Sequence, residues 1–279
     1  MALQRILYPA ISICAFLAFG PGAQAGHQAE IQARGKLTML CFPTTRTVHA
    51  FVDLDRLREA NTPVSEIRDP TYFAGIEVDL IKHFAQEMGL DLEIRAITTS
   101  YADLLQALAD GKGDLAASSL TPTEQRETFL DFTIPFSSGW VSVVVPDESK
   151  VSKWEDLRGL KGAVMKGSSQ LEYLKTHGPE DIEVILTNFT LENLAEVEEG
   201  NADFTIIDTT VGVGESPDPA SPHLKVAFHL KQFGYAMALP EGSDLRPLLD
   251  DFLQRMIDSG EVARLQARYT LESGNKPAP

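Results

Sequence analysis

The chain has 279 residues, with 24 Lys and Arg against 40 Asp and Glu, and a formal net charge of −16. Such an acidic surface argues against nucleic acid and anionic membranes as partners. The length suits either one large domain or two lobes, and both could bury a sizeable core.

Residues 1–25 have the pattern of a secretory signal peptide. Arg5 supplies a positive start, 6–19 form an apolar run, and an A-x-A cleavage sequence ends at Ala25. The apolar run is too short to indicate a membrane span. We therefore expect cleavage after Ala25 and location in the periplasm. A lipoprotein is a weaker alternative because Cys14 lies inside the apolar run, and a retained anchor helix is the third.

Apolar periodicity predicts alternating strands and helices in the first half of the chain. Residues 26–35 are expected to be an unstructured leader, and the polar, proline-marked stretch 43–73 fits no element. Strands are predicted at 36–42 and 92–97, and helices at 77–88 and 100–109. This alternation is typical of a mostly parallel sheet.

The second half repeats the alternation between two predicted crossings. A β-branched run at 140–146 is interpreted as a strand that crosses into a second lobe, and 234–239 as the strand that returns. Between them we expect strands at 162–165, 183–186 and 204–207, helices at 169–175 and 191–198, and a loop at 213–223. Helices at 245–257 and 262–269 precede a frayed tail from 273. Two crossings predict a hinge and an interlobe cleft, where ligands commonly bind.

One arginine stands out in the segment ASSLTPTEQRETFLDFTIPF, which covers 117–136. Arg126 follows a cluster of hydroxyl side chains, formed by Ser118, Ser119, Thr121 and Thr123. A guanidinium group can donate two parallel hydrogen bonds to a carboxylate. The segment therefore predicts a carboxylate-binding site.

A second segment copies the local layout of the first. In each, a glycine ending a helix is followed three residues later by Asp, and a polar group follows that Asp by five: Gly111, Asp114 and Ser119, then Gly200, Asp203 and Asp208. Ligands of open α/β sheets bind outside the carboxyl ends of strands. Ser119, Thr121 and Arg126 would then face Asp208. A chance likeness of two ordinary helix–strand turns is the alternative.

Five blocks, in order and spacing, resemble the family 3 extracellular solute-binding proteins, the periplasmic receptors of amino-acid ABC transporters. The blocks are GIEVDLIKHFAQEMG, SYADLLQALADGKGDLAASSLTPTEQRETFLDFTIPF, WEDLRGLKGAVMKGSS, GNADFTIID and FGYAMALPEGSDL, and the likeness covers residues 36–270. It implies an α/β, two-lobed periplasmic-binding-protein fold of type II. Each lobe would be a mostly parallel sheet flanked by helices, with two crossing strands as a hinge. Lobe 1 would comprise 36–136 plus 233–272, and lobe 2 would comprise 137–232.

The resemblance also implies roles for individual residues. Arg126 would clamp a ligand α-carboxylate, Asp208 would take its α-ammonium, and Ser119 and Thr121 would contact the ligand backbone. Tyr101 would pack on the ligand side chain.

Ser168 and Ser169 resemble residues that donate backbone N–H groups to the carboxylate, a role that suits a helix N-terminus. The chain departs from the family in its longer 42–73 region, where Phe42, Arg46 and Phe51 could reach the cleft. It also departs at the glycine usual near Ser119, which is a serine here.

The resemblance predicts a non-catalytic, monomeric receptor that binds a small solute and permease subunits. No cofactor is expected, and the six histidines show no metal-ligand spacing. One alternative is a cyclohexadienyl-dehydratase-like enzyme; it is disfavoured because Gln170 stands where we would place the catalytic acid. Another is a ligand-sensing module, whose fused versions need further domains for which a chain ending at Pro279 would leave no room.

Overall fold

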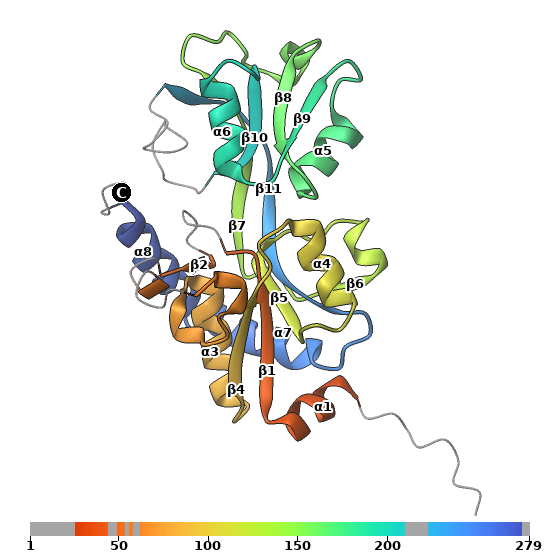
Figure 1. Cartoon of the computed structure of the whole chain (residues 1–279), viewed down its shortest axis with the longest axis vertical. Coiled ribbons are helices and arrows are strands. Elements are labelled where there is room, and N and C mark those ends of the chain that lie inside the picture. The colour runs from red at the N-terminus through yellow and green to blue at the C-terminus, as the bar shows by residue number, and fades with distance from the viewer. Residues whose placement is uncertain (1–25, 44–48, 54–55, 58–61, 210–222, 275–279) are drawn as a thin grey trace, which may run out of the picture.

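The computed structural model describes residues 26–43, 49–53, 56–57, 62–209 and 223–274. Two α/β lobes follow one another along the long axis of the molecule (Figure 1). The two-lobed fold predicted from the sequence is confirmed, and the signal peptide predicted at 1–25 lies outside the described residues.

Lobe 1 is built on a sheet in which β1 lies between two parallel neighbours, β4 and β5. Its strands are β1 (Lys36–Cys41), β4 (Asp91–Ala96), β5 (Leu115–Leu120) and β6 (Leu130–Phe132). Its longer helices are α3 (Ile76–Glu87), α4 (Tyr101–Ala109), α7 (Arg246–Asp258) and α8 (Glu261–Gly274). The last helix continues past the predicted end at 269, through the start of the tail expected to fray.

Lobe 2 repeats the arrangement, with β8 between the parallel strands β9 and β10. Its strands are β7 (Ser137–Pro146), β8 (Lys161–Met165), β9 (Glu183–Thr187), β10 (Phe204–Thr209) and the first part of β11 (Leu224–Pro240). Its helices are α5 (Ser169–His177) and α6 (Thr190–Glu198), with the short η4 (Trp154–Leu157) before β8.

The crossing strands β7 and β11 connect the lobes as an antiparallel pair. They pair from Leu224 opposite Pro146 to Tyr235 opposite Ser137, after which β11 continues in lobe 1 beside β5 and β6. Both predicted crossings are present, but β11 is much longer than the predicted 234–239. The segment LKVAFHLK alternates apolar with mostly polar residues, a strand signal that its lysines and histidine obscure.

Each sheet buries both of its faces. In lobe 1, Met39 and Leu115 pack toward α3, α7 and α8, while Leu40 and Ala116 pack toward α4. In lobe 2 one face packs on α5 and the other on α6. Strand side chains alternate between the two faces, so these near-continuous apolar runs are what a sheet covered on both sides requires.

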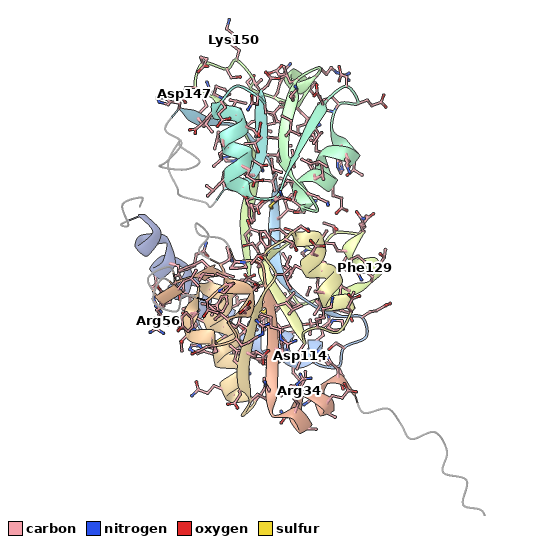
Figure 2. All side chains as sticks on the ribbon, in the orientation of Figure 1. Arg34, Arg56, Asp114, Phe129, Asp147 and Lys150 are labelled. Atoms are coloured by element: carbon pink, nitrogen blue, oxygen red, sulfur yellow. The ribbon has the colours of Figure 1, made fainter. Side chains whose placement is uncertain are left out.

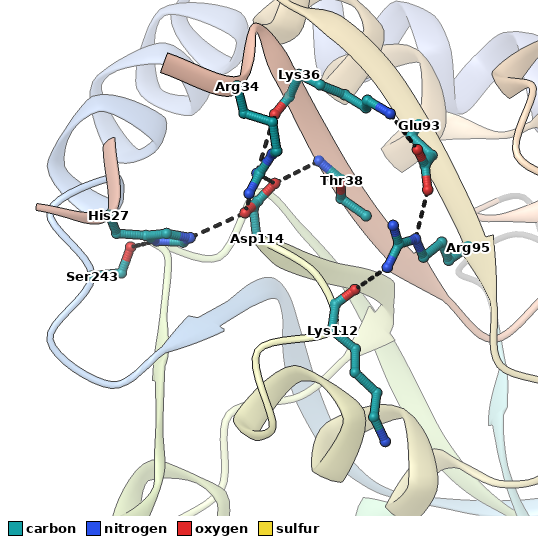
Figure 3. Close-up of polar contacts among 9 residues, drawn as sticks. All are labelled: His27, Arg34, Lys36, Thr38, Glu93, Arg95, Lys112, Asp114 and Ser243. Atoms are coloured by element: carbon teal, nitrogen blue, oxygen red, sulfur yellow. Dashed lines mark hydrogen bonds and ion pairs between the residues drawn. The ribbon is translucent and has the colours of Figure 1, made fainter. Parts of the chain in front are cut away.

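The N-terminal segment corrects one expectation. Residues 26–35 were predicted to be an unstructured leader, but α1 (His27–Arg34) is a helix that buries Ile31 and ends at Gly35. Asp114, itself buried, accepts hydrogen bonds from His27 and Arg34 (Figure 3). Local sequence holds little sign of this helix because Asp114, which binds its two ends, lies 80 residues from Arg34 and 87 from His27.

Figure 2 places Arg34 and Asp114 in lobe 1 and Asp147 and Lys150 at the opposite end of the molecule. The helix α1 therefore docks on the end of lobe 1 remote from lobe 2. The side chains of His27 and Ser243 meet there too, with 2.6 Å between Nδ1 and Oγ.

The stretch 43–73 contains only short elements where it is described. These are β2 (Phe51–Val52), η1 (Val64–Glu66), η2 (Pro70–Tyr72) and β3 (Phe73–Ala74), and β2 pairs with β3. The predicted loop 213–223 lies almost wholly outside the described residues. From the pairing of β7 with β11 we propose the predicted bounds for the lobes, 36–136 plus 233–272 and 137–232.

Candidate functional site

The two segments with matching sequence layout form matching structures. After α4, Gly111 has a φ of 71° and Asp114 exchanges hydrogen bonds with the backbone of Thr38 on β1. After α6, Gly200 has a φ of 75° and Asp203 does the same with Lys161 on β8. In both cases the aspartate ties the turn to the neighbouring parallel strand. The positions five residues on, Ser119 and Asp208, therefore lie at equivalent strand ends.

The end of β5 is irregular. Ala236 and Ala238 of β11 pair with Leu120 and Ala116, so the intervening part of β5 bulges. Ser119 lies in this bulge with a φ of 53°, the one positive φ outside glycine among the described residues. This conformation explains why a glycine would be suited to the position.

Arg126 follows β5 in the short helix η3 (Arg126–Thr128) and is 6% exposed. Its Nη1 donates to the carbonyl oxygen of Thr121 at 2.8 Å, and its Nη2 donates to that of Gly167 at 3.1 Å. Thr121 belongs to lobe 1 and Gly167 to lobe 2. Burial lowers the pKa of Arg126 from its usual value, while Glu172, Tyr101 and Asp208 raise it electrostatically. The guanidinium group is thus held between the lobes.

Helix α5 directs its N-terminus toward this arginine through Gly167. Ser168 is the N-cap: its hydroxyl accepts from the N–H of Leu171, and its own N–H and hydroxyl both donate to the carbonyl oxygen of Met165. The N–H groups of Ser169 and Gln170, in the first turn, have no partner within a helix by geometry. The backbone N–H groups that remain free to bind an anion at this end are therefore those of Ser169 and Gln170. The N–H of Ser168 already donates to Met165.

Asp208 ends the lobe 2 strand β10. Its carboxylate accepts hydrogen bonds from the side chains of Gln170 and Tyr235. The residue is exposed to solvent, but neighbouring protein partly desolvates its carboxylate. This desolvation raises the pKa of Asp208 to about 6, although Gln170, Tyr235 and Arg126 act in the opposite direction.

Aromatic rings from both lobes meet beside these charges. Phe42, at the end of β1, lies 4.7 Å from Tyr101 and 5.6 Å from Phe189 between ring centroids, and it stacks on Phe189. Tyr101 also donates from its hydroxyl to the carbonyl oxygen of Ser118 at 3.0 Å. Phe189 comes from lobe 2, so this aromatic group spans the two lobes.

Three of the predicted site residues carry hydroxyl groups outside the hydrogen bonds described above. Ser119 is half-buried, and Thr121 and Ser169 are buried. Within the described residues none of these three hydroxyls has a hydrogen-bond partner. None of the three oxygens is among the fully buried atoms that lack a partner, so each remains accessible for a hydrogen bond from outside the protein.

The structure gathers the predicted residues from the two lobes into one region, which we call the interlobe site: Tyr101, Ser119, Thr121 and Arg126 from lobe 1, and Ser168, Ser169 and Asp208 from lobe 2. Phe51 packs instead on Tyr269, and Arg46 lies outside the described residues. The sequence reasoning missed Glu77, Phe189, and Gln170 as a partner of Asp208. The sequence did hold one sign of Glu77: it is a charged residue on the helix face that is otherwise apolar.

Two absences apply to the described residues. No three His, Cys, Asp or Glu side chains are grouped there so as to hold a metal ion. None of the described helices combines the length and the apolar content needed to span a bilayer.

Comparison with known proteins places the chain in a family. The model of the bacterial extracellular solute-binding proteins, family 3, matches residues 57–272. The chain belongs to this family.

Two curated relatives and one solved structure show its range. A membrane-bound lytic murein transglycosylase F of Ectopseudomonas mendocina is 32% identical over 227 residues, which are 77% of this chain but 45% of that protein. The arginine-binding extracellular protein ArtP of Bacillus subtilis is 26% identical over 207 residues, 73% of this chain and 80% of ArtP. The amino acid ABC transporter substrate-binding protein AbpA of Streptococcus pneumoniae, bound to L-arginine, has a TM-score of 0.70 at 22% identity and covers 88% of this chain and 99% of AbpA.

These family 3 relatives differ in length as well as in name. The chain spans less than half of the transglycosylase and most of ArtP. The likeness to AbpA shows the fold. The family therefore includes both binding proteins and proteins with an enzymatic name.

Proposed function

We propose that the protein is a periplasmic receptor that binds an amino acid in the interlobe site and delivers it to an ABC permease. One observation carries the proposal: Arg126 and Asp208 come from different lobes, and each affects the pKa of the other electrostatically. A zwitterion needs a cation for its carboxylate and an anion for its ammonium. Arg126 is a buried charge, which is tolerated when it is paired, and Asp208 is an exposed carboxylate, so a zwitterionic ligand would pair with both.

The chemistry of the surrounding groups supports the same orientation. The ligand carboxylate would lie between Arg126 and the first turn of α5, where free N–H groups and the helix dipole favour an anion. The ligand ammonium would lie on Asp208. The hydroxyls of Ser119, Thr121 and Ser169 would bond the remaining polar atoms, and the aromatic group of Phe42, Tyr101 and Phe189 would contact the side chain.

A thermal-shift screen of the purified protein against the twenty amino acids tests the proposal, because a ligand that binds only the folded state raises the melting temperature. L-Arginine is the first probe, since ArtP is an arginine-binding protein and aromatic faces attract cations. We expect a shift that disappears in both Arg126→Ala and Asp208→Ala. A shift that survives Asp208→Ala would exclude the zwitterion clamp.

The same binding could serve ligand sensing instead of transport, and we keep this as the second candidate because a relative 32% identical to the chain is named as a membrane-bound lytic murein transglycosylase and not as a binding protein. Uptake of a labelled amino acid separates the two. A transport receptor predicts that deleting the gene reduces uptake in the source bacterium. Unchanged uptake by the deletion strain, with binding intact, would favour a sensing role.

Non-enzymatic function remains part of the proposal. Gln170 contacts Asp208 where an acid would be expected in a dehydratase-like enzyme, and an amide does not exchange protons near neutral pH as a carboxylate does. Phenylpyruvate release from prephenate would contradict the proposal.

The proposed function also includes export to the periplasm and a monomeric state. We infer that cleavage after Ala25 releases the protein into the periplasm as a monomer. N-terminal sequencing of the periplasmic protein should begin at Gly26, and light scattering should give the monomer mass.

A further inference from the structure

Glu77 is a fully buried carboxyl group close to the interlobe site. It is the second residue of α3 and is 0% exposed. Its two carboxyl oxygens both accept from the backbone N–H of Ser119, each at 3.0 Å. Burial raises the pKa of Glu77 to about 8, with the Ser119 hydrogen bond acting against it. Burying a carboxyl group lowers stability unless it is hydrogen-bonded. Its hydrogen bonds with Ser119 are therefore the feature to explain.

Ser119 is in a conformation that its side chain disfavours. A left-handed φ is unfavourable for a residue with a Cβ because the Cβ crowds the following carbonyl oxygen, and Ser119 is held at a φ of 53°. Its N–H also leaves the sheet, because the bulge in β5 breaks the pairing with β11 between Ala116 and Leu120. Glu77 supplies the acceptor that the sheet does not.

The bulge in turn fixes the ligand-facing groups of lobe 1. On one side of Ser119, the carbonyl oxygen of Ser118 accepts from Tyr101, and the Ser118 hydroxyl bonds the backbone of Phe42. On the other side, the carbonyl oxygen of Thr121 accepts from Arg126. A change in the path of the backbone at Ser119 would therefore move Tyr101, Phe42 and Arg126 together.

We propose that Glu77 is a positioning residue for ligand binding, which holds the Ser119 bulge in its left-handed conformation and thereby sets the lobe 1 half of the interlobe site. This inference rests on the proposed function, because it assigns Glu77 to a ligand site. Glu77 does not touch the ligand; it acts through Ser119.

The surroundings of Glu77 are consistent with a positioning role. The neighbouring titratable groups that feel its charge are Cys41, Tyr101 and Tyr235, and burial raises the pKa of all three. All are uncharged near neutral pH, so no neighbouring cation in this set accounts for a carboxyl group here. The N–H of Glu77 itself donates to the carbonyl oxygen of His49, which fixes the start of α3.

The test separates positioning from simple stability with five variants. Glu77→Met removes both acceptors and should weaken amino-acid binding by about tenfold or more, as expected for a buried N–H left unsatisfied. The unsatisfied N–H of Ser119 should also lower the melting temperature without ligand, so the affinities of all variants are compared at a temperature at which each is folded. Glu77→Gln keeps one acceptor and should recover most of the affinity. Glu87→Gln, an exposed change in the same helix, is the matched control.

Adding Ser119→Gly to Glu77→Met should restore part of the affinity, since glycine adopts a positive φ without an anchor. Ser119→Gly alone measures the loss of the hydroxyl. Affinities are measured by calorimetry with the twenty amino acids as probes, L-arginine first. Wild-type affinity in Glu77→Met, or a loss of affinity that follows the melting temperature and is not rescued by Ser119→Gly, would overturn the inference.

Hydrogen exchange of the Ser119 amide gives a readout that needs no ligand. In Glu77→Met this amide should exchange much faster than in the wild type, while amides of β1 keep their protection. If wild-type protein binds no amino acid, the proposed function fails. The exchange comparison still tests whether Glu77 holds the Ser119 amide in place. Unchanged protection of Ser119 would refute the role of Glu77 by itself.

Discussion

Arg126 in lobe 1 donates a hydrogen bond to the carbonyl oxygen of Gly167 in lobe 2, with 3.1 Å between Nη2 and the oxygen. Gly167 has a φ of 73°, and a Cβ placed on it would lie 2.9 Å from both the Cβ and the N of Ala102 in lobe 1. The turn before α5 therefore meets lobe 1 backbone to backbone. The residue that the cation contacts across the lobes must be a glycine.

Gly167→Ala should weaken closure of the lobes. The added methyl group would contact Ala102 and would disfavour the positive φ, so the turn could not approach Arg126 as it does now. We expect weaker amino-acid binding and a larger radius of gyration in small-angle X-ray scattering. Gly159→Ala is the matched control, because Gly159 has a φ of 70° and a Cβ added to it would meet nothing within 4 Å. Equal affinity losses in the two variants would contradict this contact.

Binding should depend on pH through Asp208, whose pKa is raised to about 6. A ligand ammonium binds the ionised carboxylate. Affinity should therefore be highest well above pH 6 and should fall as the pH drops below 6. The dissociation constant should rise toward about tenfold per pH unit in that range. Calorimetry between pH 4.5 and pH 7 checks this, and Asp208→Asn should bind weakly with no such slope. A wild-type affinity that is constant over this range would exclude Asp208 as the ammonium partner.

Phe189 should help to hold the lobes together. Its ring stacks on Phe42 across the lobes although Phe189 is 37% exposed. Aromatic pairs contribute about 0.5–1.5 kcal/mol beyond area burial, so Phe189→Ala should speed ligand release and enlarge the ligand-free protein in scattering. Leu191→Ala removes a similarly exposed apolar side chain from the same region of lobe 2. Identical behaviour of the two variants would argue against a specific role for Phe189.

Asp114 should stabilise lobe 1 without affecting the site. Although burial raises the pKa of Asp114, hydrogen bonds from His27, Arg34 and Thr38 bring it below the usual value. The resulting stability is present above the ordinary carboxyl pKa and is lost as the pH falls through the lower folded value.

Asp114→Asn should therefore lower the free energy of unfolding by about 1–3 kcal/mol near neutral pH and reduce its decline in acid. Thermal unfolding between pH 3 and pH 7 measures both effects. Asp110→Asn, an exposed change in the same turn, should be nearly silent. An Asp114→Asn protein as stable as the wild type would show that α1 docks by other contacts.

Local patterns determined much of this protein in advance. The helix, glycine, Asp and strand sequence that leads to Ser119 also leads to Asp208, and its periodicity and turn chemistry act over a few residues. For that reason the order of elements, the two crossings and the candidates Arg126 and Asp208 could be found without coordinates. The extent of β11 was underestimated because polar residues alternate along its outer positions.

Only the tertiary structure decided which distant groups meet. Glu77 and Ser119 are 42 residues apart, and Arg126 and Gly167 are 41 apart. Nothing in the local sequence of either partner specifies such contacts, because they depend on how strands and helices pack. The same holds for Phe42 with Phe189 and for α1 with Asp114. Sequence periodicity therefore set the elements and the chemistry available, and packing between distant segments set the geometry of the site.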